Sequence, residues 1–217
     1  MGKSGFHRFK LSKHVLEALD AKGWTKPTEI QRDTLQAALY GRDLVGQAQT
    51  GSGKTAAFGI PIIEATSATK QTQSLILCPT RELAVQVASE MEWLQGDKGL
   101  TIETVYGGTD LERQAKKLNA GVDIIVGTPG RVIDMTKRGH LELSKIEIFC
   151  LDEADRMLDM GFFPDVTWII SQAPSRKQTL LFSATFPQEV LDASEELLKD
   201  PEQVFTGGTE IEVPEID

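Results

Sequence analysis

Short apolar runs alternate with segments of helical periodicity along most of the chain. The apolar runs predict buried strands at residues 43–46, 74–78, 102–106, 123–126, 146–151 and 179–182. Periodic apolar positions predict helices within residues 11–22, 28–40, 56–60, 81–94, 110–119, 130–138, 163–172 and 187–199. Apolar strands that alternate with helices are typical of a sheet covered on both faces. The sequence therefore predicts an α/β fold with a mainly parallel sheet.

Polar residues or glycines follow most of the predicted strands. These segments are residues 79–82, 107–109, 128–131, 152–155 and 183–185. In folds of this kind, ligands bind beyond the carboxyl ends of the strands. We therefore expect all these segments to line one edge of the sheet and to form the functional site.

The segment Ala48–Thr55 lies between a predicted strand and a predicted helix, as a phosphate-binding loop requires. Its glycines let backbone N–H groups surround a polyphosphate, while Lys54 can reach the β and γ phosphates and Thr55 can bind Mg²⁺. Ala48 stands where the common pattern has glycine, and it fits if its φ is negative. The alternative is a flexible Gly/Ser loop. The expected nucleotide contacts are Gln49, Thr50, Gly51, Ser52, Gly53, Lys54 and Thr55.

An acidic pair, Asp152 and Glu153, directly follows a predicted apolar strand. In phosphate-loop ATPases a carboxylate at this position holds Mg²⁺, and its neighbour can polarise the attacking water. Acidic pairs after strands also serve as helix caps, which is the alternative. With the phosphate-binding loop upstream, we expect Lys54, Asp152 and Glu153 to be catalytic, with Asp152 and Thr55 as metal ligands.

Several motifs together resemble the DEAD-box family of ATP-dependent RNA helicases, and the resemblance covers nearly the whole chain. They occur in the family's order as Trp24–Gln31 with Phe6 upstream, Ala48–Thr55, Pro79–Ala84, Gly107–Gly108, Thr128–Arg131, Asp152–Asp155 and Ser183–Thr185. The resemblance implies a RecA-like three-layer sandwich of the P-loop NTPase class, with ATP and Mg²⁺ as cofactors and RNA as partner.

The resemblance also implies roles for individual residues. Gln31 would recognise adenine through its amide, and Phe6 would stack on the adenine ring. Without the motif, Gln31 would be interpreted as a solvent-facing helix residue and Phe6 as a loosely packed end residue. Backbone contacts to RNA are implied for Pro79, Thr80, Arg81, Gly107, Gly108, Thr128, Gly130 and Arg131. Both arginines alternatively form surface salt bridges. Coupling of hydrolysis to strand separation is implied for Asp155, Ser183 and Thr185, although Ser183 and Thr185 alternatively cap the helix near Pro187.

Composition limits the remaining possibilities. The chain has 217 residues and a net charge of −9, so it is long enough for one domain, and any nucleic-acid site must be local. No apolar run approaches the roughly 18 to 20 residues of a membrane span, and the N-terminus lacks a signal-peptide core. Cys78 and Cys150 lie in apolar runs without metal-ligand spacing. We expect a cytoplasmic monomer.

The expected domain organisation is a RecA-like domain at residues 1–208, followed by an acidic tail or interdomain linker at residues 209–217. Nothing after Ser183–Thr185 resembles the arginine-containing motifs of the family's second RecA-like lobe. We therefore expect an amino-terminal lobe with little ATP turnover and no unwinding on its own. An ATP-gated RNA clamp is the alternative function, and Gln31 and Ala154 argue against a DNA translocase of the same superfamily.

Overall fold

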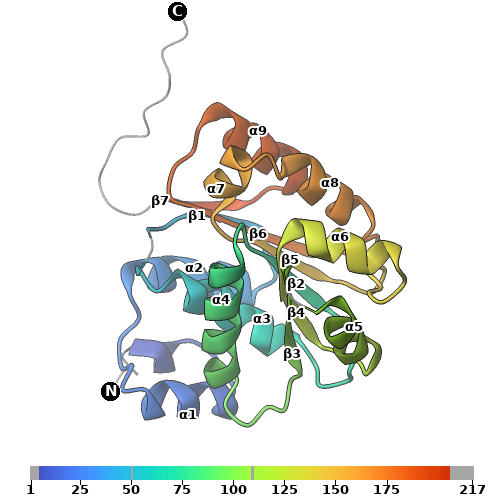
Figure 1. Cartoon of the computed structure of the whole chain (residues 1–217). Coiled ribbons are helices and arrows are strands. Elements are labelled where there is room, and N and C mark those ends of the chain that lie inside the picture. Colours follow the sequence, from blue (N-terminus) through green and yellow to red (C-terminus); the bar gives the residue numbers. More distant parts are fainter. Residues whose placement is uncertain (1–4, 50, 109, 206–217) are drawn as a thin grey trace, which may run out of the picture.

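The computed structural model describes residues 5–49, 51–108 and 110–205, which form one sheet between two layers of helices (Figure 1). The strands are β1 (Leu44–Gln47), β2 (Ser74–Leu77), β3 (Ile102–Val105), β4 (Ile124–Gly127), β5 (Ile148–Leu151), β6 (Gln178–Ser183) and β7 (Glu202–Phe205). Their order in the sheet is β3-β4-β2-β5-β6-β1-β7, and all neighbouring strands are parallel. The predicted α/β fold is thereby confirmed.

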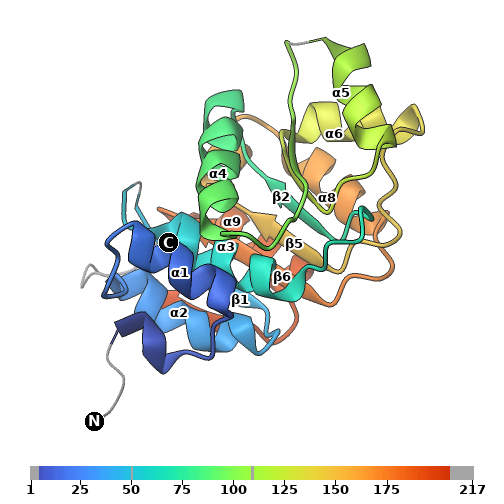
Figure 2. The ribbon, with the colours of Figure 1, turned by 90° about the horizontal axis from the view of Figure 1, so that it is seen from below.

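The helices divide between the two faces of the sheet. One group consists of α1 (Lys13–Ala21), α2 (Glu29–Leu39), α3 (Lys54–Ala65) and α4 (Arg81–Leu94). The other consists of α5 (Leu111–Asn119), α6 (Pro129–Lys137), α7 (Ala154–Asp159), α8 (Phe163–Ser171) and α9 (Gln188–Leu197). Figure 2 shows this division from below, with α1, α2 and α3 on one side of the strands and α6 and α8 on the other.

Each face of the sheet has its own hydrophobic core, because successive strand residues point to opposite faces. In β5, Cys150 packs with the α1–α4 layer, whereas Phe149 and Leu151 pack with the α5–α9 layer. Cys150 and Cys78 are free thiols, and burial raises the pKa of both well above the usual value. These cysteines therefore act as buried apolar residues, as the sequence predicts.

The six predicted strands and the predicted helices are present with small shifts at their ends. The structure adds three short elements that the sequence patterns did not predict. They are a 3₁₀ helix at Gly5–Arg8, α7 directly after the acidic pair, and the edge strand β7. Among the described residues, no helix is long and apolar enough to cross a membrane. The acidic tail lies outside the described residues.

Candidate functional site

The segments that follow the strands meet at the carboxyl edge of the sheet. The phosphate-binding loop follows β1, and the acidic pair follows β5, with β6 between these two strands. Thr80 and Thr128 follow β2 and β4, and β4 lies next to the edge strand β3. The order of the strands therefore places the expected nucleotide site near the middle of this edge and the expected RNA contacts toward its β3 end.

The phosphate-binding loop has the backbone conformation that its sequence requires. Gly51 and Gly53 have φ values of 81° and 86°, in the left-handed region that favours glycine. A Cβ atom on Gly53 would also lie 2.5 Å from Gln31 Nε2, so only glycine fits there. Ala48 is buried with a negative φ, which meets the condition for replacing glycine. Thr50, also expected in this loop, lies outside the described residues.

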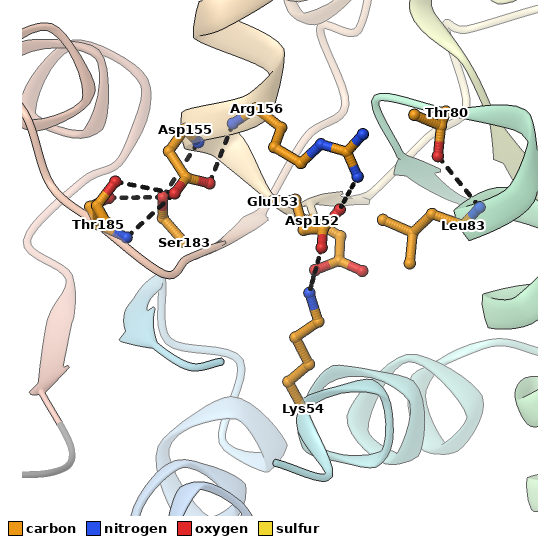
Figure 3. A network of polar contacts seen from close by, with 9 residues as sticks. All are labelled: Lys54, Thr80, Leu83, Asp152, Glu153, Asp155, Arg156, Ser183 and Thr185. Carbon is orange, nitrogen blue, oxygen red and sulfur yellow. Dashed lines mark hydrogen bonds and ion pairs between the residues drawn. The ribbon is translucent and has the colours of Figure 1, made fainter. Parts of the chain in front are cut away.

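Lys54 connects the loop to the acidic pair (Figure 3). Its Nζ lies 2.9 Å from Asp152 Oδ1 and 3.6 Å from Glu153 Oε1. Burial lowers the pKa of Lys54, but the attraction of the two carboxylates outweighs it and raises the pKa above its usual value. Burial raises the pKa of Asp152, and the attraction of Lys54 only partly offsets the effect. The three expected catalytic residues thus form one cluster.

Glu153 occupies an unusual backbone conformation, with φ 56° and ψ 55° in the left-handed region. A residue with a Cβ atom adopts this conformation at a cost of about 1–2 kcal/mol. Glu153 stands immediately before α7, and its Oε2 lies 3.5 Å from Nη1 of Arg156 on that helix. Backbone strain of this kind is typical of functional positions, which agrees with the expected catalytic role.

The residues around Asp152 suit a magnesium ion. The carboxylate is fully buried, its Oδ1 pairs with Lys54, and its Oδ2 has no hydrogen-bond partner among the described residues. Thr55 lies at the start of α3, next to Lys54, and contributes a hydroxyl oxygen. Carboxylate and hydroxyl oxygens are ligands that Mg²⁺ prefers, together with phosphate oxygens and water. The donor set therefore fits Mg²⁺.

A cavity of about 490 Å³ opens beside the phosphate-binding loop. Its walls come from the loop, the segment before α2, and α4; they are Gly23, Trp24, Thr25, Lys26, Thr28, Gln31, Gly51, Gly53, Lys54, Thr55, Leu83, Gln86 and Glu90. The loop and the Trp24–Gln31 motif, which are separate in the sequence, therefore share one cavity. Its size is within the range of small-ligand sites.

Gln31 is fully buried, so it is not a solvent-facing helix residue. Its Oε1 accepts a hydrogen bond from Thr28 N at 2.9 Å, and its Nε2 donates to Gly53 O at 3.0 Å. The amide thus joins the start of α2 to the phosphate-binding loop. It retains a second N–H and a second lone pair, so adenine recognition stays a prediction.

Phe6 lies in the 3₁₀ helix and is only 2% exposed, so it is not the loosely packed end residue that its position suggests. It packs in the core of the α1–α4 layer and is not among the residues that line the cavity. Gly5 beside it contacts Thr25 so closely that a Cβ atom would lie 2.0 Å from Thr25 O. The segment therefore adjoins the cavity wall, and stacking of Phe6 on adenine stays a prediction.

The three residues expected to couple hydrolysis to movement form one hydrogen-bond network (Figure 3). Thr185 donates to Asp155 Oδ2 from its hydroxyl at 2.9 Å and from its backbone N at 3.2 Å. Ser183 accepts from Asp155 N at 3.1 Å and donates to Thr185 O at 2.7 Å. The N-cap of α9 is Pro187, which has no side-chain cap bond. The alternative of helix capping by Ser183 or Thr185 is therefore wrong.

At the β3 end of the edge, two helices begin at threonines. Thr80 caps α4 by accepting a hydrogen bond from Leu83 N at 3.2 Å, and Thr128 is the N-cap of α6, which starts at Pro129. Pro79, before Thr80, is buried. Helix N-termini present N–H groups that suit phosphate oxygens. The helices predicted at residues 81–94 and 130–138 therefore begin within one residue of their predicted starts, and the RNA contacts stay predictions.

The two expected RNA-binding arginines are held by uncharged neighbours. Arg81 lies over the ring of Tyr106, with its guanidinium carbon 4.9 Å from the ring centroid. Arg131 Nη1 donates to Gln114 Oε1 at 3.2 Å, and Gln114 Nε2 donates to Tyr106 O at 3.0 Å. Arg81 has no ion pair with another of the described residues. Sequence reasoning did not identify the supporting residues Tyr106 and Gln114.

Three glycines leave open space at the same end of the edge. A Cβ atom built on Gly107, Gly108 or Gly130 would meet no heavy atom within 4 Å. Gly108 also has a φ of 81°, which requires glycine. Without side chains at these positions, a ligand with phosphate groups could approach the backbone close to the starts of α4 and α6. These three expected RNA-binding glycines are therefore exposed, whereas Pro79 is buried.

The fold and the site define a class. A parallel sheet between two helical layers, with a glycine-rich loop before α3 and a buried carboxylate after β5, makes this a RecA-like domain of the P-loop class. The family model described as DEAD/DEAH box helicase matches residues 28–193. The chain therefore belongs to the DEAD/DEAH box helicase family, as the motifs predict.

Individual relatives agree with this assignment. The chain is 44% identical to the DEAD-box ATP-dependent RNA helicase CshA of Streptococcus pneumoniae, over 98% of the chain and 41% of that protein. It is also 44% identical to CshA of Geobacillus kaustophilus, over 97% of the chain and 45% of that protein. The chain thus spans less than half the length of these curated relatives.

Solved structures give the same result. A DEAD box protein from Methanococcus jannaschii superimposes with a TM-score of 0.90 at 44% identity, over 94% of the chain and 56% of that protein chain. A hypothetical ATP-dependent RNA helicase from Sulfolobus tokodaii has a TM-score of 0.84 at 37% identity. The match covers 90% of the chain and 57% of that protein chain. The predicted RecA-like fold is confirmed.

Proposed function

We propose that the chain is the ATP-binding lobe of an RNA-dependent ATPase that remodels or unwinds RNA duplexes. The observation that best supports the proposal is the cluster of Lys54, Asp152 and Glu153 beside the cavity. The proposal gives these three residues the roles of a phosphate-binding cation, a metal-binding carboxylate and a base. The names of the relatives, which are ATP-dependent RNA helicases, agree with this function.

In the proposed reaction each residue of the cluster has a separate task. Lys54 exchanges its contact with Asp152 for the β and γ phosphates of ATP, which releases the carboxylate. Thr55 and Asp152 hold Mg²⁺, which neutralises charge on the phosphate oxygens when it is bound. Glu153 accepts a proton from the attacking water. Gln31 reads adenine, and its bonds to Thr28 and Gly53 transmit base binding to the loop.

RNA binds at the β3 end of the same edge, through its backbone. The N–H groups at the starts of α4 and α6, with Arg81 and Arg131, face the phosphates, and Gly107, Gly108 and Gly130 allow close approach. Such contacts do not depend on base sequence. The network of Asp155, Ser183 and Thr185 joins the start of α7, directly after the acidic pair, to the end of β6, and it couples ATP hydrolysis to strand separation.

A second RecA-like lobe completes the ATP site with its arginines. It also supplies the other half of the RNA groove. Loss of such an arginine costs about 10³–10⁵ in rate, so the 217-residue chain alone turns over little ATP and unwinds nothing. The test measures ATP binding, and ATP turnover with and without single-stranded RNA. Binding with near-background turnover supports the proposal. Absence of ATP binding, or strong RNA-stimulated turnover by the chain alone, would contradict it.

A further inference from the structure

Helices α3 and α4 pack against each other at a glycine. A Cβ atom on Gly59 of α3 would lie 3.4 Å from Leu94 Cδ1 and 3.5 Å from Met91 Cγ, both on α4. One helical turn toward each N-terminus, four residues earlier, stand Thr55 on α3 and Glu90 on α4. The helix packing therefore places the side chains of Thr55 and Glu90 opposite each other at the edge of the sheet.

The surroundings of Glu90 agree with this placement. Glu90 is half-buried and lines the nucleotide cavity together with Thr55 and Gln86. The Thr55 hydroxyl and the Lys22 ammonium both stabilise its carboxylate, against the effect of burial, which raises the pKa of Glu90. None of the tasks assigned above to the nucleotide site uses this carboxylate. A half-buried charge at this position therefore needs an explanation.

We infer that Glu90 is a positioning residue that orients the hydroxyl of Thr55, and this inference rests on the proposed function. A threonine hydroxyl has one hydrogen to donate and two lone pairs to share. When Glu90 accepts the hydrogen from the α4 side, both lone pairs of Thr55 Oγ1 stay available for a metal ion. Carboxylates that orient metal ligands in this way affect metal affinity by about 10–100-fold.

Calorimetric titration of ADP into the chain, with Mg²⁺ and with EDTA, tests the inference without depending on turnover. We expect Glu90→Ala to weaken ADP binding about tenfold in Mg²⁺ and to leave binding in EDTA unchanged. Glu90→Gln keeps an oxygen acceptor in the same place, so it should recover most of the lost affinity. Glu195→Gln, an exposed carboxylate on α9, is the matched control and should bind as the wild type does.

A double-mutant cycle with Thr55→Val identifies the partner. Once the hydroxyl is gone, Glu90→Ala should have no further effect on Mg²⁺-dependent affinity. Equal weakening in Mg²⁺ and EDTA would indicate a general structural role and overturn the inference, as would unchanged affinity. Thermal unfolding of each variant confirms that it is folded. If the wild-type chain itself binds no ADP, the proposed function fails, which is a different result from failure of the Glu90 inference.

Discussion

The Lys54 ammonium lies 2.9 Å from the Asp152 carboxylate, although the two residues follow different strands that are separated by β6 in the sheet. Both side chains are buried, with 8% and 0% of their surface exposed. A buried ion pair is held in place because each charge would be costly alone. Each residue therefore helps to hold the other in position.

Replacing Lys54 with alanine should remove nucleotide affinity and also destabilise the fold. Loss of one partner of a buried ion pair costs about 3–5 kcal/mol near neutral pH. Lys177→Ala is the control, because its 3.6 Å contact with Glu147 is exposed and should contribute less than about 1 kcal/mol. Denaturant unfolding of both variants at pH 7 provides the measurement, and equal losses would contradict the prediction.

The stability of Lys54→Ala should also depend on pH. Burial raises the pKa of Asp152, and loss of Lys54 removes the main attraction that offsets this rise. A carboxyl with a raised pKa binds its proton more tightly in the folded state, so the free energy of unfolding falls as pH increases from about 4 through the raised value. The deficit of the variant relative to the wild type should be larger at pH 8 than at pH 5. A constant deficit would mean that Asp152 stays ionised.

Much of the fold could be predicted from sequence because strands buried on both faces are apolar throughout. The edge strand β7 was missed because its residues alternate between partly buried and exposed, and its sequence, Glu202–Phe205, lacks an apolar run. Helix α7 was missed because it is short and begins directly after Glu153, in a left-handed conformation that local propensity does not favour. Strand β7 and helix α7 therefore depend on the elements packed beside them rather than on their own sequence pattern.

The ATP site could be predicted because its residues stand next to one another in recognisable motifs. Glu90, Tyr106 and Gln114 could not be found in that way, since their positions depend on how α4, β3 and α5 pack. For Glu90, the sequence offers one indication: it lies four residues before Leu94, and therefore on the same face of α4. Sequence also could not show that Phe6 is buried, because a terminal aromatic residue packs only when the segment folds back onto the domain.

Glu153→Gln should separate binding from hydrolysis in a protein that joins this chain to a second RecA-like lobe. The amide keeps the shape of the side chain and loses the basic oxygen, so turnover should fall by about 10²–10⁴. ATP affinity should stay close to the wild-type value, because Lys54, Thr55 and Asp152, which are proposed to hold the phosphates and Mg²⁺, are unchanged. Steady-state turnover and equilibrium binding provide the two measurements. Normal hydrolysis by the variant would exclude Glu153 as the base.

Thr185→Val should uncouple hydrolysis from unwinding in the same two-lobe protein. The substitution removes the 2.9 Å hydroxyl bond to Asp155 and keeps the backbone bond, so it should cost only about 1 kcal/mol of stability. Thr185→Ser, which keeps the hydroxyl, is the control. We expect RNA-stimulated turnover to persist while duplex separation is lost. A parallel loss of both activities would indicate damage to the ATP site instead of uncoupling.

Arg131→Ala should weaken RNA binding equally for all sequences. Loss of one phosphate contact should reduce the slope of log affinity against log salt by about 0.7 for single strands. Gln114→Ala leaves the charge and removes the 3.2 Å bond to Arg131, so affinity should fall with little change in slope. Arg138→Ala, at the other end of α6, is the control. Fluorescence anisotropy over a range of salt would test all three, and an unchanged slope for Arg131→Ala would exclude a phosphate contact.

Two glycines should respond to alanine in opposite directions. At Gly59, inside α3, an added Cβ would make ordinary contacts at 3.4 Å and 3.5 Å, so Gly59→Ala should stabilise the fold by about 0.5–1 kcal/mol. At Gly127, the end of β4, it would lie 2.6 Å from Val132 Cγ2 and 2.9 Å from Val105 O. Because Val105 O belongs to the backbone and cannot easily move, Gly127→Ala should destabilise by about 1–3 kcal/mol. Denaturant unfolding of the two variants measures both effects, and destabilisation by Gly59→Ala would show that α3 and α4 are packed too tightly for a methyl group.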